Sequence, residues 1–264
     1  MKRWAAGRWR RLAFAGAAGA GIGCFLAWAA NWYFFITGNL RGPDFFSFYA
    51  AAQIYVQRGG SAVYDILVQK QYELAITHDS PASFIVLPYF HPPYYTLLIA
   101  PLASLDYRSA YYTMTVFNVL MAIALITILV RGSESIHGRA VIVATALIAG
   151  FLPLFVTILQ GQSDLVVLVP LAAAYTAWAR GRAGWAGVLS ALALSKPQLV
   201  LLIPVLFIAR RSWRALAGFG AAIAVLAAVS LVGFGWDATI GYVNSVGSWA
   251  IGGSTQKPLD AGNG

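Results

Sequence analysis

The sequence has little charge and almost no cysteine. Only 10% of its residues are charged, whereas a soluble domain carries about a quarter. Its single cysteine, Cys24, excludes an intrachain disulfide and lies inside an apolar run, as a small packing residue would. The sequence also lacks a glycine-rich phosphate loop, an HExxH or CxxC motif and a paired-carboxylate metal motif. We therefore expect no site for soluble nucleotide-sugar chemistry, and we predict no metal site and no cofactor.

Apolar residues, by contrast, are abundant. They make up 59% of the chain, the mean hydropathy is +0.70, and several runs are long enough to cross a bilayer. The net charge of +9 does not indicate a nucleic-acid partner, because the basic residues form short clusters between apolar runs, as in cytoplasmic loops. This composition predicts an all-α polytopic membrane protein in contact with membrane lipid.

The first apolar run covers residues 12–37 and follows a basic tail at 1–11. The two together resemble a signal peptide. However, the run is long enough to span a membrane with tilt, and it ends in an aromatic belt at residues 32–35. We therefore predict that the tail is cytoplasmic and that the run is a retained first span.

Residues 38–91 are more polar and form a predicted extracytoplasmic loop. The pattern predicts two short amphipathic helices in this loop. One runs from Asp44 to Arg58 and ends at Gly59-Gly60, and the other runs from Asp65 to His78. Each Asp stands at an N-cap position. The aromatic residues of the first helix would let it lie in the membrane interface.

Residues 92–235 form a predicted membrane bundle, and residues 236–264 a polar tail, so that residues 1–264 make one transmembrane domain. The predicted segments are 92–105 (short, with Pro101), 110–130, 140–159 (with Pro153), 165–178, 184–209 (interrupted by Lys196-Pro197-Gln198) and 215–234. Only some of these are long enough to be full spans.

Two topologies are open. If the basic clusters at 1–11, 131–139, 180–182 and 210–214 are all cytoplasmic, then 92–105 and 184–209 are hairpins with short arms. Lys196 and the Gly161-Gln162-Ser163-Asp164 turn then face the same side as Asp44. If 88–105 and 184–209 are single spans instead, Arg180 and Arg182 lie outside and Gln162 lies inside. We favour the first topology because it gathers the polar residues at the membrane edge on one side.

Asp44 is the candidate catalytic residue. As an N-cap it would be held in its ionised form by backbone N–H groups and by the helix dipole. An ionised carboxylate in a partly dry site can also accept a proton from an incoming hydroxyl group. The structural and the catalytic interpretations of Asp44 are therefore compatible.

The same loop contains four candidate substrate-binding residues. Tyr49 lies in the first predicted loop helix. Tyr64 and Asp65 precede the second, where Asp65 as an N-cap competes with a hydrogen-bonding role toward a sugar. His91 stands at the re-entry into the membrane, where an acceptor-binding role competes with a structural one.

Three further candidates lie at the edges of spans. Gln162 and Asp164 either shape a tight turn or line a polar cavity. Lys196 has no acidic neighbour in sequence and precedes the helix-breaking Pro197. It either snorkels to the interface or binds a phosphate group, and we favour the phosphate.

Several motifs, in this order and spacing, resemble glycosyltransferase family 87, the polyprenol-phosphate-mannose-dependent membrane mannosyltransferases. The resemblance covers about residues 40–235 and rests on residues 43–52, 60–65, 89–93, 101–103, 161–164, 186–197 and 210–214. It implies a GT-C-type helical bundle, with the catalytic Asp in the loop between the first and second membrane segments. That residue would be Asp44, acting as general base in an inverting hexosyl transfer, by resemblance of mannose.

The resemblance also implies the partners: a polyprenyl-phosphate-linked sugar donor and a lipid or glycan acceptor, used on the extracytoplasmic side of a bacterial inner membrane. Lys196 would stabilise the departing phosphate. Two features depart from the family. Asp164 stands where we expect Asn, and relatives carry more spans, so we expect the chain to be C-terminally incomplete relative to the family.

Two other functions remain open. A multi-span transporter or lipid flippase would use similar intramembrane polar residues, but the internal repeats that many transporters have are not found in this sequence. The chain could also be an inactive truncated membrane protein. The large loop after the first span favours the glycosyltransferase.

Overall fold

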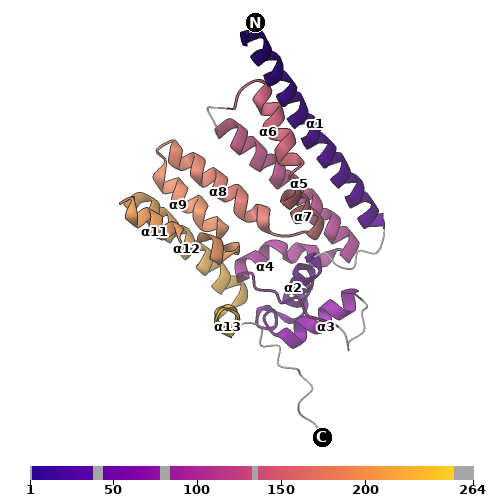
Figure 1. Cartoon of the computed structure of the whole chain (residues 1–264). Coiled ribbons are helices and arrows are strands. Elements are labelled where there is room, and N and C mark those ends of the chain that lie inside the picture. The colour runs from indigo at the N-terminus through magenta and orange to yellow at the C-terminus, as the bar shows by residue number, and fades with distance from the viewer. Residues whose placement is uncertain (1, 38–43, 78–83, 133–135, 253–264) are drawn as a thin grey trace. The chain divides into compact units, whose positions relative to one another are not determined.

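The computed structural model describes residues 2–37, 44–77, 84–132 and 136–252, and for 2–10 and 248–252 only the backbone (Figure 1). Within these ranges the regular structure is entirely helical. The chain is therefore an all-α polytopic membrane protein, as the composition predicts. The helices group into two compact units, unit 1 (Met1–Phe45 with Leu105–Ala224) and unit 2 (Phe46–Ser104 with Val225–Gly264).

Unit 1 is built on the longer helices. Its elements are α1 (Lys2–Thr37), α5 (Tyr107–Gly132), α6 (Arg139–Ala149), α7 (Leu152–Gln160), α8 (Asp164–Ala179), α9 (Ala183–Leu192), η3 (Ala193–Ser195), α10 (Pro197–Val200), α11 (Ile203–Ala209) and the first half of α12 (Trp213–Phe234). Unit 2 holds α2 (Phe45–Arg58) after its first residue, η1 (Gly60–Ala62), α3 (Ile66–Thr77), α4 (Pro93–Ile99), η2 (Ala100–Ser104), the end of α12, and α13 (Trp236–Gly252).

Three helices in the described ranges are long and apolar enough to cross a membrane: α1 over Arg11–Thr37, α5 and α12. The segment predicted as one span at 140–159 consists of two helices, α6 and α7, which are bent by 48° and together keep the length and composition of one broken span. Pro153 lies in the first turn of α7 and cannot continue a ladder of backbone hydrogen bonds from α6. The sequence located this proline but did not predict the break before it.

The predicted interruption at Lys196-Pro197-Gln198 is present. α9 ends at Leu192, η3 follows, and α10 begins with Pro197. A proline at the first position of a helix costs no backbone hydrogen bond, because an N–H group at that position would have no partner inside the helix. Lys196 is thereby left at a break between helices.

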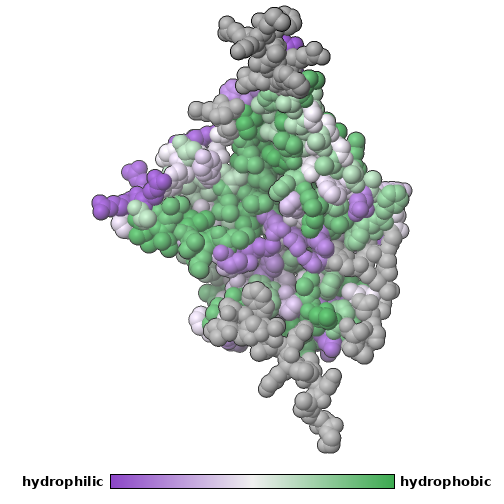
Figure 2. All heavy atoms as spheres, in the orientation of Figure 1, coloured by the Kyte–Doolittle hydropathy of each residue, from purple (hydrophilic) through white to green (hydrophobic). Residues whose placement is uncertain are grey.

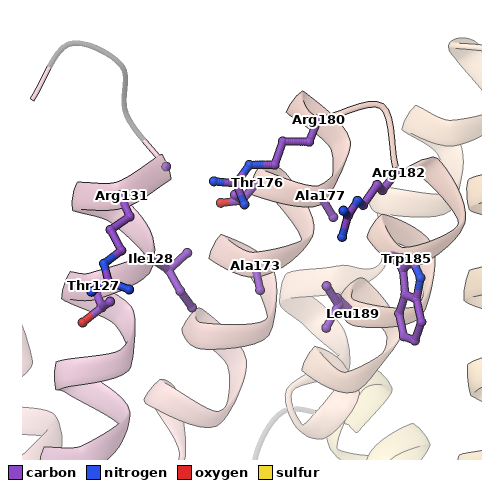
Figure 3. A pocket seen from close by; sticks show the side chains of 11 residues that line it. Thr127, Ile128, Arg131, Ala173, Thr176, Ala177, Arg180, Arg182, Trp185 and Leu189 are labelled. Carbon is purple, nitrogen blue, oxygen red and sulfur yellow. The ribbon is translucent and has the colours of Figure 1, made fainter.

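The helices of unit 1 place the basic clusters at one end. α1 packs along α6, and α8 packs against both α5 and α9. The end of α5, the start of α6, and the α8–α9 and α11–α12 connections lie at one end of these helices, and the α7–α8 turn lies at the other (Figure 1). Arginines from α5 and from the α8–α9 connection line a cavity there (Figure 3). The favoured topology requires the basic clusters to lie at one end of the helices. Which side of the membrane this end faces stays a prediction.

The visible surface of the unit 1 helices is largely apolar (Figure 2). Large hydrophobic side chains are exposed on α5, α8 and α11, among them Val116, Ile123, Leu168 and Leu206. In water such a surface would be unfavourable, whereas lipid chains cover it without cost. The chain is an integral membrane protein.

In unit 2, α2 packs aromatic side chains inside the unit, and its position in the membrane interface stays a prediction. Phe48 contacts the rings of Tyr89 and Tyr95, and Tyr55 stacks on Phe234 with centroids 4.6 Å apart. The segment we expected to be a polar tail begins with helix α13, over Trp236–Gly252.

Glycine sets the distance between α1 and α6, which gives a prediction. A Cβ atom at Gly21 would lie 2.5 Å from the carbonyl carbon of Ala146, whereas one at Gly23 would meet nothing within 4 Å. We expect Gly21→Ala to push the two helices apart and lower the melting temperature of the detergent-solubilised protein. Gly23→Ala, the matched control, should preserve or raise it, because Ala is favoured over Gly in a helix by roughly 0.5–1 kcal/mol. Equal effects of the two variants would contradict this close packing.

Candidate active site

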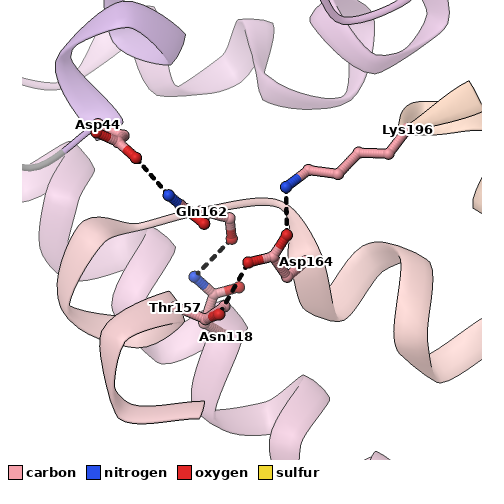
Figure 4. Close-up of polar contacts among 6 residues, drawn as sticks. All are labelled: Asp44, Asn118, Thr157, Gln162, Asp164 and Lys196. Carbon is pink, nitrogen blue, oxygen red and sulfur yellow. Dashed lines mark hydrogen bonds and ion pairs between the residues drawn. The ribbon is translucent and has the colours of Figure 1, made fainter. Parts of the chain in front are cut away.

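Asp44 is tied to the turn between α7 and α8, although the two are far apart in sequence (Figure 4). One oxygen of its carboxylate accepts a hydrogen bond from the side-chain amide of Gln162. Its backbone N–H donates to Oε1 of Gln160 at 3.0 Å. Asp44 directly precedes α2, in agreement with the predicted helix start, and its carboxylate is held against the polar turn.

The turn needs glycine at Gly161 for two reasons. Gly161 has φ +63°, in the left-handed region that glycine tolerates best. A Cβ atom there would also lie only 2.8 Å from Cβ of Phe45, the residue after Asp44. Asn118 on α5 supports the turn further by donating from Nδ2 to the backbone oxygen of Gln162 at 3.2 Å.

Asp164 begins α8 and links the turn to Lys196. Its Oδ2 accepts a hydrogen bond from Thr157 Oγ1 at 2.9 Å, and its Oδ1 forms an ion pair with the Lys196 ammonium group. The Lys196 and Asp164 side chains are 21% and 30% exposed, so the pair is partly shielded from water. Lys196 thus has an acidic partner that its sequence neighbourhood does not reveal.

The structure brings four of the eight predicted site residues together in unit 1: Asp44, Gln162, Asp164 and Lys196. We call them, with Asn118 and Thr157, the turn cluster. It holds a carboxylate that can accept a proton and an ammonium group that can face an anion. The sequence analysis missed Asn118 and Thr157. The signal that could have found them is a polar side chain inside a predicted span, where such groups need a partner.

The other four predicted residues lie in unit 2. Asp65 caps α3, accepting hydrogen bonds from the N–H groups of Leu67 at 2.8 Å and Val68 at 3.3 Å, which confirms its predicted structural role. The Tyr64 hydroxyl donates to the backbone oxygen of His91 at 2.8 Å. Burial raises the pKa of Tyr64, so this phenol stays protonated.

His91 and Tyr49 also have partners inside unit 2. The His91 ring lies 4.9 Å from that of Phe48 and 4.8 Å from that of Tyr95, centroid to centroid. The Tyr49 hydroxyl accepts a hydrogen bond from Gln53 at 3.0 Å. Contacts with substrate stay predictions for all four residues. In the described part of the chain, no three His, Cys, Asp or Glu side chains are close enough to hold a metal ion.

Comparison with known proteins places the chain in a family. The family model of glycosyltransferase family 87 matches residues 89–258, more than half of the chain. The chain therefore belongs to glycosyltransferase family 87. No curated protein and no solved structure matches it.

Membership in family 87 identifies a membrane glycosyltransferase. Gln162, Asp164 and Lys196 of the turn cluster lie inside the matched residues, as does His91. Asp44 precedes them, so its connection to the family region is the hydrogen bond with Gln162. The structure thus adds to the family match a contact that links Asp44 to its polar turn.

Two buried side chains of helix α3 in this glycosyltransferase hold residues 84–92, which have no regular secondary structure. Gln69 accepts a hydrogen bond from the N–H of Tyr89 at 3.0 Å and donates to the oxygen of Val63 at 2.7 Å. Glu73, which is fully buried, accepts from the N–H of Leu87 at 3.0 Å. Burial raises the pKa of Glu73 from 4.5 to about 7, against the opposing effect of the Leu87 N–H.

This pKa shift predicts how stability depends on pH. The folded state binds the Glu73 proton more tightly than the unfolded state, so the stabilising effect is complete below pH 4.5 and is lost as pH rises to about 7. Glu73→Gln keeps an acceptor for Leu87 and carries no charge. We expect it to raise the melting temperature at pH 8 and to have little effect at pH 4.5, measured in detergent.

The control is Asp106→Asn, because Asp106 caps α5 and its pKa is lowered, chiefly by a hydrogen bond from the Ser109 side chain. A carboxylate whose pKa is lowered by folding stabilises the folded state at any pH above its unfolded pKa. This variant should therefore lower the melting temperature at pH 8. A Glu73→Gln effect that does not change between pH 4.5 and pH 8 would contradict the prediction.

Proposed function

We propose that the protein transfers a hexose, by resemblance mannose, from a polyprenyl-phosphate-linked donor to a lipid or glycan acceptor on the extracytoplasmic side. The observation that carries this proposal is the turn cluster, which connects the carboxylate of Asp44 to the ammonium group of Lys196 through the α7–α8 turn. A displacement at a sugar–phosphate bond needs these two groups: a base for the attacking hydroxyl and a cation for the departing phosphate.

Asp44 acts as the general base. Gln162 holds one oxygen of its carboxylate, and the carboxylate takes the proton of the acceptor hydroxyl as the hydroxyl oxygen bonds to the anomeric carbon. The bond between this carbon and the phosphate oxygen breaks at the same time, and its electron pair leaves with the lipid phosphate. Attack from the face opposite the phosphate inverts the anomeric centre, as in inverting glycoside hydrolases.

Lys196 balances the negative charge that develops on the lipid phosphate. An ammonium group has three N–H donors, so it can bind Asp164 and a phosphate oxygen together. Thr157 fixes the Asp164 carboxylate, which in turn fixes the position of the ammonium group before donor binds. The partial shielding of this pair from water strengthens its electrostatic effect on the phosphate.

Asp44→Asn tests the base. Asparagine keeps an oxygen that can accept the Gln162 hydrogen bond, but it does not accept a proton at neutral pH. We expect sugar transfer to fall by about 10²-fold or more, in the range of general-base contributions. The measurement is transfer from a radiolabelled polyprenyl-phosphate sugar in membranes. Asp106→Asn, which alters a helix cap outside the turn cluster, is the control and should transfer normally. Undiminished transfer by Asp44→Asn would refute the assignment.

A double variant separates the two roles of Lys196. Lys196→Ala leaves the partly buried Asp164 carboxylate without its ion-pair partner, so we expect lower stability as well as weaker use of the donor. Asp164→Asn with Lys196→Ala removes that unpaired charge and should restore the melting temperature but not the rate at low donor concentration. If the double variant recovers both, Lys196 serves only to pair with Asp164.

A further inference from the structure

A second polar feature of unit 1 lies at the opposite end of its helices from the turn cluster. There a cavity of about 460 Å³ opens between α5, α8 and α9 (Figure 3). Arg131 in the last turn of α5, Arg180 at the C-terminal end of α8 and Arg182 just before α9 line it. None of the residues proposed for sugar transfer takes part in it.

These three arginines line one cavity, and among the described residues no acidic side chain lines it with them. None of the three guanidinium groups forms an ion pair in the described part of the chain. Like charges gathered in this way repel one another until an anion binds among them, and planar guanidinium groups match the oxygens of a phosphate.

The rest of the cavity is apolar. Ile128, Ala173 and Leu189 line it below the arginines, and Trp185, which is 63% exposed, stands at its side (Figure 3). Trp is typical of the level at which lipid headgroups meet hydrocarbon. A free phosphate ion would gain nothing from apolar walls, whereas a phospholipid places its phosphate and the start of its acyl chains next to each other.

We propose that this cavity binds the phosphate-bearing headgroup of an anionic phospholipid from the leaflet at the basic end of unit 1. The alternative is that the arginines only orient the chain in the membrane. A matched set separates the two, since Arg210 and Arg211 in the α11–α12 connection and Arg214 in the first turn of α12 lie at the same end but outside the cavity.

The experiment titrates the full chain in neutral detergent with phosphatidylglycerol or phosphatidylcholine of identical acyl chains, and counts bound lipids by native mass spectrometry. We expect the anionic lipid to bind at least about tenfold more tightly, since each arginine near a headgroup contributes about 1 kcal/mol. In the variant R131Q/R180Q/R182Q this preference should largely vanish, and in R210Q/R211Q/R214Q it should persist.

Equal loss of the preference in both triple variants would overturn the proposal, as would its absence in the unmodified protein. A third arm adds inorganic phosphate as competitor, and displacement of the lipid at equimolar phosphate would identify a free-anion site instead. Circular dichroism checks the fold of each variant. If the cavity triple variant does not fold, the single variant Arg182→Gln replaces it. We expect this variant to lose several-fold of the preference for the anionic lipid, and an unchanged preference would overturn the proposal.

Discussion

The polar turn between α7 and α8 is the constraint on which the candidate site depends. A turn among apolar helices exposes backbone groups and polar side chains to surroundings that cannot hydrate them, so each needs a protein partner. Gly161 supplies the left-handed backbone conformation and the space for Phe45 to approach. Asn118 then binds the backbone of Gln162, whose own side chain holds Asp44. The position of the proposed base thus follows from the requirements of the turn.

Charge compensation explains why the turn is also suited to chemistry. A lone carboxylate or ammonium group at the edge of a bilayer is unfavourable, and the Asp164–Lys196 pair relieves both at once. The family pattern leads us to expect Asn where Asp164 stands, and a neutral amide would not balance the charge of Lys196 in this way. In this chain the ammonium group therefore carries a resident carboxylate, which lowers its net charge but fixes its position.

The sequence predicted what local chemistry controls and missed what tertiary contacts decide. Apolar length predicted the spans that became α5 and α12, and the cap preference of Asp65 predicted the start of α3. Proline predicted the break at Lys196. The partner of Lys196 was not predictable, because the pairing with Asp164 arises only when the break after η3 meets the α7–α8 turn. The contribution of Asn118 was hidden in the same way, within a run that reads simply as apolar.

The two polar ends of unit 1 are linked by the length of the helices between them. Asp164 and Arg180 lie at opposite ends of α8, and a helical rise of about 1.5 Å per residue separates them by about 24 Å. This is less than the roughly 30 Å thickness of the hydrocarbon core. If a lipid headgroup holds Arg180 at the surface of one leaflet, Asp164 and Lys196 lie slightly inside the opposite edge. A donor phosphate must then leave bulk water to reach the ammonium group, and there the attraction between the two is stronger than at the surface. An anionic lipid bound far from the turn cluster would in this way contribute to donor binding by fixing the depth of the helices in the membrane.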